Sequence, residues 1–214
     1  MFVSDWMTRK VFTVAPDDGI SDAIRLLKEK KIKHIPVVRE NRLKGIISDR
    51  DIKEFSPSAA STLDVYELHY LLAKTKVKEV MKSKVRTTSP DTPIEEAARI
   101  MHDFSIGCLP VMEDDRIVGI ISDRDIFHAL VDITGVRHGG HRIFMPVPDR
   151  SGSVKDVADI IRKHGFQLQS ILTSYEKAKE GYRNIVIRTS GKGQFGAMKA
   201  ELQGTYQDVR IKKG

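Results

Sequence analysis

Two serine–aspartate pairs are the residues of this chain best suited to chemistry: Ser48 with Asp51, and Ser122 with Asp125. Each pair sits inside the same eight residues, Gly-Ile-Ile-Ser-Asp-Arg-Asp-Ile, where an apolar run gives way to a polar one. This pattern predicts a strand that leads directly into a helix. Unpaired N–H groups at a helix start favour phosphate, and a carboxylate can accept both hydroxyls of a ribose. The serines are therefore predicted to contact a phosphate, and the aspartates a ribose.

An arginine inside each pair supports the prediction of an anionic ligand. Arg50 and Arg124 carry a fixed positive charge on a forked group that suits a phosphate. The alternative is that Ser48 and the acidic residue after it only cap a helix, which is the commoner role of these residue types. A cap needs one polar residue, so two copies of the whole octet favour a binding site.

The two octets close an internal duplication. Residues 6–52 recur at 80–126 with a constant offset of 74 and no gap, and 21 of the 47 aligned positions are identical. A repeated unit that cannot bury its apolar face alone packs against its copy. We therefore expect the two copies to pack together and any site to appear twice.

Each copy is predicted to have the order β-α-β-β-α. In the first copy a short strand over 13–14 precedes a turn and a helix. Apolar runs over 35–38 and 43–47 then predict a strand, a tight turn and a second strand, and the octet opens a second helix. The first helix is identified by apolar residues at helical spacing: Ile20, Ala23, Ile24 and Leu27.

The end of the chain differs from the duplication in charge. Residues 1–138 hold 22 basic and 22 acidic side chains, whereas residues 139–214 hold 14 and 7, which accounts for the net charge of +7. Residues 134–140 are predicted to be a flexible joint, and residues 56–61 a linker of small residues followed by a helix over 63–74. A domain boundary is therefore expected near residue 139.

The basic segment is predicted to have the order βαββαβ, which is that of a ferredoxin-like sandwich. Together with the duplication, this gives an α+β fold class. The expected strands cover residues 142–147, 167–175, 183–189 and 208–211.

The composition also indicates several absences. No apolar run is long enough to cross a bilayer, and the first residues do not have the pattern of a signal peptide, so we expect a cytoplasmic protein without membrane contact. The single cysteine excludes an internal disulfide framework. Because no nucleophile–base constellation and no metal-ligand set is visible, we expect no catalytic residues, no metal, no cofactor and no enzymatic activity.

The duplication resembles a tandem pair of CBS domains, also called a Bateman module, over about residues 1–137. The matched features in the first copy are Thr13-x-x-Pro16, His34-Ile35-Pro36-Val37 and the octet, and in the second Thr87-x-x-Pro90, Cys108-Leu109-Pro110-Val111 and the octet. The resemblance implies pseudo-twofold packing and two clefts that bind AMP, ADP, ATP or S-adenosylmethionine. It also implies base pockets lined in one cleft by Ile32, His34 and Ile46, and in the other by Ile106, Cys108 and Ile120. The exchange of His34 for Cys108 predicts unequal affinities.

The basic segment resembles an ACT domain through Pro148-Asp149-Arg150-x-Gly152-x-Val154. The resemblance implies an amino-acid ligand near Asp149 and Gly152, although Gly152 equally suits a turn alone. Two CBS units and one ACT unit form the layout of acetoin-utilisation proteins of the AcuB type. The expected domains are 1–62, 63–138 and 139–214.

These observations favour a non-catalytic sensor that binds an adenosine compound and passes its state to the ACT domain or to an unidentified regulated protein. Both resemblances imply a homodimer. The alternative is a nucleic-acid-binding regulator that uses the basic C-terminal domain. The absence of a helix-turn-helix, zinc or RNA-binding aromatic motif counts against nucleic acid as a partner.

Overall fold

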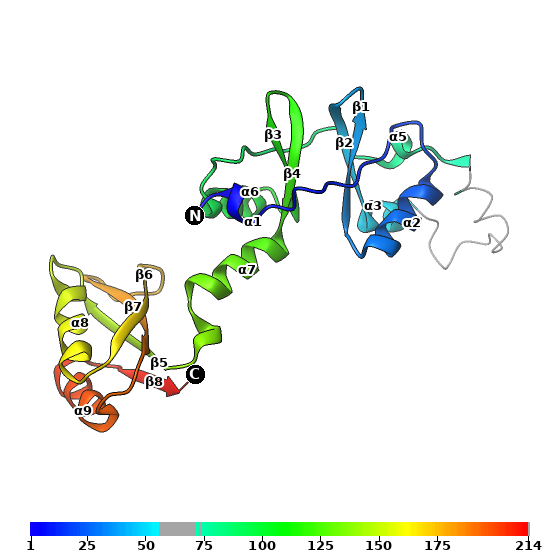
Figure 1. The fold of residues 1–214 in the computed structure, drawn as a ribbon. Coiled ribbons are helices and arrows are strands. Elements are labelled where there is room, and N and C mark those ends of the chain that lie inside the picture. Colours follow the sequence, from blue (N-terminus) through cyan, green and yellow to red (C-terminus); the bar gives the residue numbers. More distant parts are fainter. Residues whose placement is uncertain (56–71, 73, 214) are drawn as a thin grey trace, which may run out of the picture. The chain divides into compact units, whose positions relative to one another are not determined.

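The computed structural model describes residues 1–55, 72 and 74–213, and it divides into two compact units, Met1–Ile126 and Phe127–Gly214. Both units combine helices with antiparallel strands (Figure 1). The linker predicted over 56–61 lies outside the described residues, as does nearly all of the helix predicted over 63–74. Among the described residues, no helix is both long and apolar enough to span a membrane.

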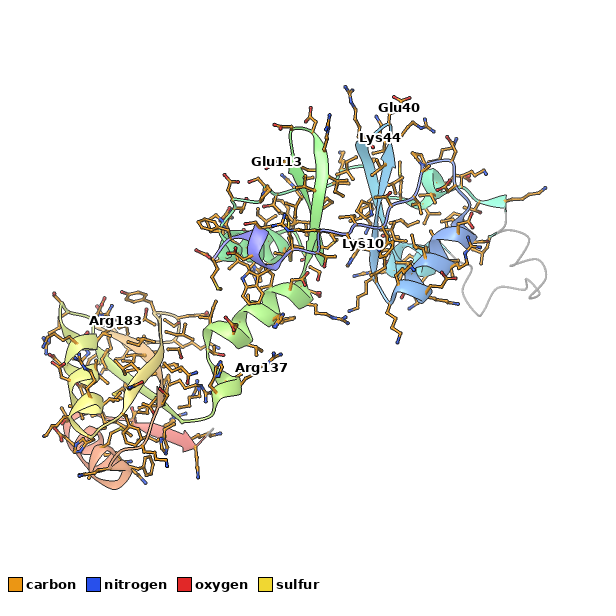
Figure 2. All side chains as sticks on the ribbon, in the orientation of Figure 1. Lys10, Glu40, Lys44, Glu113, Arg137 and Arg183 are labelled. Carbon is orange, nitrogen blue, oxygen red and sulfur yellow. The ribbon has the colours of Figure 1, made fainter. Side chains whose placement is uncertain are left out.

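The first unit contains both copies of the repeat, and each copy is built on a two-stranded hairpin. Its elements in chain order are α1 (Val3–Trp6), α2 (Ile20–Lys30), β1 (His34–Arg39), β2 (Arg42–Ser48), α3 (Asp49–Phe55), α5 (Val77–Val80), α6 (Ile94–Asp103), β3 (Cys108–Glu113) and β4 (Arg116–Ser122). The helix α7 (Asp123–Ile133) follows β4 directly and crosses the division between the units. Figure 2 shows Glu40 at the tip of the first hairpin, between β1 and β2.

The two hairpins have the same register. His34 pairs with Ser48 at the open end of the first hairpin, and Cys108 pairs with Ser122 at the open end of the second. β2 and β4 lie against each other, so the hairpins pack together as the duplication predicts. Each hairpin therefore brings a residue expected at the base pocket beside a residue expected at the phosphate.

The opening segment of each copy is bonded to the other copy. The Val3 N–H donates to the Thr92 carbonyl over 2.9 Å, and 74 residues later the Val77 N–H donates to the Asp18 carbonyl over the same distance. Thr8 and Ile120 are joined by a pair of backbone hydrogen bonds, one in each direction. Lys82 and Ile46 are joined by a second such pair. Figure 1 shows α1 beside α6 and the second hairpin, and α5 beside the first. The opening segment of each copy is therefore hydrogen-bonded to the other copy, and we call these two segments the exchanged segments.

The short strand predicted over 13–14 is reduced to a single bridge. Val14 pairs with Val37 in parallel, and Thr88 pairs with Val111 in the same way in the second copy. The proline two residues further on in each copy lacks an N–H and the chain turns there, so the pairing does not extend.

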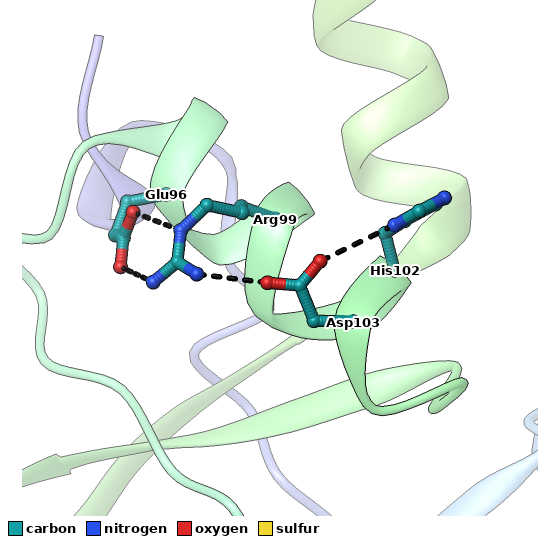
Figure 3. Close-up of polar contacts among 4 residues, drawn as sticks. All are labelled: Glu96, Arg99, His102 and Asp103. Carbon is teal, nitrogen blue, oxygen red and sulfur yellow. Dashed lines mark hydrogen bonds and ion pairs between the residues drawn. The ribbon is translucent and has the colours of Figure 1, made fainter.

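The surface of α6 carries an ion-pair network (Figure 3). The Arg99 guanidinium donates to both carboxylate oxygens of Glu96 over 2.9 and 2.6 Å, and to Asp103 over 2.8 Å. His102 Nδ1 lies 3.3 Å from the other oxygen of Asp103. In the first copy Arg25 pairs with Asp22 at the corresponding positions over 2.8 Å. These neighbours at i+3 and i+4 support exposed helices in both copies and form no binding site.

The second unit contains a four-stranded antiparallel sheet with the order β6-β7-β5-β8. The predicted βαββαβ order is present. Its elements are β5 (His141–Pro148), α8 (Ser153–Lys163), β6 (Gln167–Ser174), β7 (Tyr182–Ser190), α9 (Phe195–Thr205) and β8 (Arg210–Lys213), preceded by the short 3-10 helix η1 (Val136–His138). Its fully buried core comes from both helices and from the central strands: Ile143, Met145, Val147, Val157, Ile161, Ile185, Ile187, Met198 and Leu202.

The segment predicted as a flexible joint, residues 134–140, is instead held to this sheet. Arg188 of β7 is only 6% exposed, and its guanidinium donates to the carbonyls of Thr134 and Gly139, each over 3.0 Å. Glycines favour flexibility, but those of this segment adopt the positive φ that the turn requires. The two compact units divide between residues 126 and 127 and not near residue 139. The predicted domain bounds 1–62, 63–138 and 139–214 stay a prediction.

Candidate functional site

Each serine–aspartate pair lies where a strand passes directly into a helix. β2 ends at Ser48 before α3, and β4 ends at Ser122 before α7. The Ser48 backbone N–H donates to Asp51 Oδ2 over 2.9 Å, and the Ser48 hydroxyl donates to the same oxygen. Ser122 makes the same two bonds to Asp125, over 2.8 and 2.7 Å. The junction predicted from the octet is therefore present in both copies.

The capping alternative is supported in the first copy, because the Asp51 N–H donates back to Ser48 Oγ over 3.2 Å. Capping engages only one carboxylate oxygen of Asp51. The other, Oδ1, lies 2.9 Å from the ammonium group of Lys82. Asp51 is 6% exposed and Lys82 is 64% exposed. An exposed ammonium group can move away at little cost, so a ligand can displace Lys82 from Oδ1. The cap uses only Oδ2 and can remain in place.

The Asp51 carboxyl is held in its charged form. Burial by itself raises the pKa of this group, but hydrogen bonds from Ser48 and Lys82 outweigh burial and lower the pKa below its ordinary value. At neutral pH Asp51 is thus an ionised acceptor, as a contact to ribose hydroxyls requires.

A cavity of about 420 Å³ opens beside Asp51, within the size range of small-molecule sites. We call it the Asp51 cleft. Both copies contribute to it. It is lined by Lys33, His34, Ile46, Ser48, Asp49, Arg50, Asp51, Lys82, Lys84, Val85, Arg86, Ser105, Ile106, Gly107 and Cys108.

The cleft brings together seven of the residues predicted from sequence, but in a different grouping. Ser48, Arg50, Asp51, His34 and Ile46 of the first copy line it as expected. Ile106 and Cys108, expected in the other cleft, also line it, because β1 and β3 start close to each other and Gly107 faces the His34 ring. The lining does not include the other predicted residues, Ile32, Ile120, Ser122, Arg124 and Asp125.

His34 and Cys108, predicted to make two separate clefts unequal, lie together in this one cavity, and the unequal affinities stay a prediction. Burial lowers the pKa of His34, although Asp123 and Asp51 oppose the change. Burial raises the pKa of the Cys108 thiol to about 12, and the same two carboxylates add to the effect. At neutral pH the cleft therefore presents a neutral imidazole and a protonated thiol, which suit an uncharged base better than an anion.

Several lining residues were missed by the sequence analysis: Lys33, Asp49, Lys82, Lys84, Val85, Arg86, Ser105 and Gly107. Asp49 belongs to the octet, but the others lie outside the motifs, and most of them differ between the two copies. The signal that could have found them is the list of positions at which one copy departs from the other. In the residues that the structure describes, no group of three or more His, Cys, Asp or Glu side chains is arranged to hold a metal ion.

The second predicted site lies in the turn between β5 and α8. Gly152 has φ +85° and stands in open space, since a Cβ built on it would meet nothing within 4 Å. Asp149 Oδ1 lies 3.4 Å from the Tyr175 hydroxyl and 3.7 Å from Arg183 Nε. The glycine thus has a positive φ and open space above it, which a turn alone also explains, and the ligand site at Asp149 and Gly152 stays a prediction.

Comparison with known proteins identifies the repeat. The family model described as "CBS domain" matches residues 3–58 and 77–132, which together are more than half of the chain. Among curated proteins, the CBS domain-containing protein YhcV of Bacillus subtilis is 33% identical over 124 residues, covering 58% of this chain and 81% of that protein.

The chain is also similar to solved structures, of which three bear on its function. The one described as an acetoin utilization protein (AcuB) from Vibrio cholerae is 32% identical with a TM-score of 0.54, covering 64% of this chain and 96% of that one. CBSX2 in complex with AMP is 29% identical with a TM-score of 0.51, covering 62% and 97%. The CBS domain pair of MJ0100, in complex with 5'-methylthioadenosine and S-adenosyl-L-methionine, is 27% identical with a TM-score of 0.51, covering 61% and 99%.

Proposed function

Because the chain belongs to the CBS-domain family, we propose that its first unit is a non-catalytic sensor that binds an adenosine compound. The observation that carries the proposal is the Asp51 cleft, where a buried ionised carboxylate, a helix start and a neutral apolar wall meet in about 420 Å³. Two similar solved structures hold AMP or adenosyl compounds, which supports the same ligand class here.

We propose these roles for the lining. Asp51 Oδ1 accepts the ribose hydroxyls after Lys82 moves aside, while Ser48 and Arg50 contact phosphate. The base lies against the apolar and neutral side chains, namely Ile46, Ile106, His34 and Cys108. A second cleft of the same kind would use Ser122, Arg124, Asp125, Ile120 and Ile32.

Calorimetric titration of the full chain with AMP, ADP, ATP and S-adenosylmethionine tests the proposal. We expect Asp51→Ala to weaken the tighter binding event about ten- to a hundredfold, because a charged hydrogen-bond acceptor is worth about 1.5–3 kcal/mol. Asp125→Ala is the matched control, since it alters the corresponding residue of the other copy. Failure of all four compounds to bind, or binding that neither substitution weakens, would exclude the sensor.

We also propose how the signal leaves the first unit. Residues 139–214 form an ACT-type domain that takes an amino acid at Asp149 and Gly152, and they or a regulated protein receive the state of the clefts. The supporting observations are the βαββαβ order, the open turn and the likeness to a structure described as an acetoin utilization protein, which favours a role in acetoin metabolism.

The same titration with free amino acids, carried out on the wild-type protein and on the variant Gly152→Val, tests the C-terminal site. A side chain at Gly152 would occupy the open space and disfavour the positive φ, so we expect it to abolish amino-acid binding. Equal binding by both proteins would place the ligand elsewhere. We propose further that the protein is a homodimer, which sedimentation equilibrium can check.

A further inference from the structure

The Asp51 cleft carries more positive charge than a nucleoside needs. Its lining holds five cationic side chains against two carboxylates, Asp49 and Asp51. The five are Lys33, Arg50, Lys82, Lys84 and Arg86. A concave surface with this excess of one sign attracts anions.

Three of these cations are free to meet a ligand. Lys82 is paired with Asp51, and Arg50 with Glu54 over 2.7 Å. In the described part of the chain, Lys33 and Lys84 form no ion pair, and both are exposed at the cleft. Arg86 stacks on the Phe104 ring with 3.9 Å from its guanidinium carbon to the ring centre, which leaves the donor edges of the guanidinium open.

The arrangement of the cations differs between the two copies. At the offset of 74, the positions that correspond to Lys33, Lys82 and Arg86 hold Gly107, Thr8 and Phe12. Only Arg50 and Lys84 have cationic counterparts, Arg124 and Lys10. Two further lining residues, Ser105 and Gly107, correspond to Lys31 and Lys33, so the counterpart positions of the whole lining hold four cations against five in the Asp51 cleft.

We propose that the Asp51 cleft recognises the phosphate chain, and that it binds an adenosine di- or triphosphate more tightly than a monophosphate. This inference rests on the adenosine-binding function proposed above. The octet and the apolar wall hold the nucleoside, and Lys33, Lys84 and Arg86 hold the additional phosphates. At the positions of Lys33 and Arg86 the other copy holds Gly107 and Phe12, so the two copies place their cations differently around the octet.

Titration of the full chain with adenosine, AMP, ADP and ATP at about 0.15 M salt tests this. We expect ATP to bind about tenfold more tightly than AMP at the site that Asp51→Ala weakens, because charge-assisted hydrogen bonds to phosphate are about twice as strong as neutral ones. The double variant Lys33→Gln, Lys84→Gln should reduce this ratio to about twofold and leave AMP affinity within about threefold. Raised salt should weaken ATP more than AMP.

The control is Lys10→Gln, which neutralises the counterpart of Lys84. Figure 2 labels Lys10 on the extended segment between α1 and α2. We expect this variant to keep the wild-type preference for ATP. Equal affinity of AMP and ATP at the site sensitive to Asp51, or an equal loss of both in the double variant, would overturn the inference and leave the adenosine sensor standing. If no adenosine compound bound at all, the proposed function would fail with it.

Discussion

Replacing Gly45 with alanine is expected to lower the free energy of unfolding by about 2–3 kcal/mol, and the same change at Gly119 by about 1–2 kcal/mol, as overpacking a filled site does. A Cβ on Gly45 would lie 2.6 Å from the Met81 sulfur and 2.9 Å from the Lys82 carbonyl oxygen. On Gly119 it would lie 2.5 Å from the Met7 sulfur and 3.3 Å from a backbone oxygen. The backbone yields less readily than a methionine, so the first change costs more. Urea unfolding of both variants measures the difference.

A double-mutant cycle shows whether the exchanged segments cause the loss. Met81→Ala removes the sulfur that an added Cβ at Gly45 would meet, and Met7→Ala does the same for Gly119. We expect Met7→Ala to recover most of the cost at Gly119, and Met81→Ala only part of the cost at Gly45, because the Lys82 carbonyl remains. Strictly additive effects in both cycles would mean that the glycines are needed for some other reason.

The helices and strands of the repeat could be predicted from the sequence, because the same apolar spacing occurs in both copies and each copy supports the assignment of the other. The helix of the first copy, both hairpin strands and the Ser48 junction lie where apolar spacing and the octet placed them. The exchange of opening segments could not be predicted in this way. A segment of four to eight residues has the same local pattern whether it pairs with its own copy or with the other, and only tertiary packing decides between them.

The exchange also explains why half of the cleft was missed. Lys82 lies 31 positions from Asp51 in the sequence, yet it meets the Asp51 carboxylate because its segment is bonded to Ile46 of the other copy. Resemblance identifies residues that a family shares, whereas Lys82 is specific to one copy. The flexible joint predicted over 134–140 is wrong for a related reason, since the local sequence does not indicate that Arg188, far along the chain, donates to the carbonyls of Thr134 and Gly139.

A saturating adenosine nucleotide is expected to raise the unfolding temperature of the first unit by roughly 10 °C. Ligand at a hundred times its dissociation constant adds about 2.7 kcal/mol to the free energy of unfolding. For a domain of this size, such a gain raises the midpoint temperature of unfolding by roughly 10 °C. Trp6 of α1 is the single tryptophan of the chain and lies in an exchanged segment of this unit. Its fluorescence during heating therefore reports on this unit.

The second unit has its own buried core, built around Ile187 and Met198, and binds no nucleotide in the proposed function. Calorimetric scanning of the same sample should then show added heat stability in the transition that Trp6 follows. If the Asp51 cleft is the site, Asp51→Ala should keep at most about half of it at the same nucleotide concentration, because a site weakened tenfold is still partly filled. A shift that Asp51→Ala retains in full would assign the stabilisation to another part of the chain. A shift of Trp6 fluorescence without any added heat stability would show that the nucleotide rearranges the exchanged segment and does not stabilise the fold, which contradicts tight binding to the folded state.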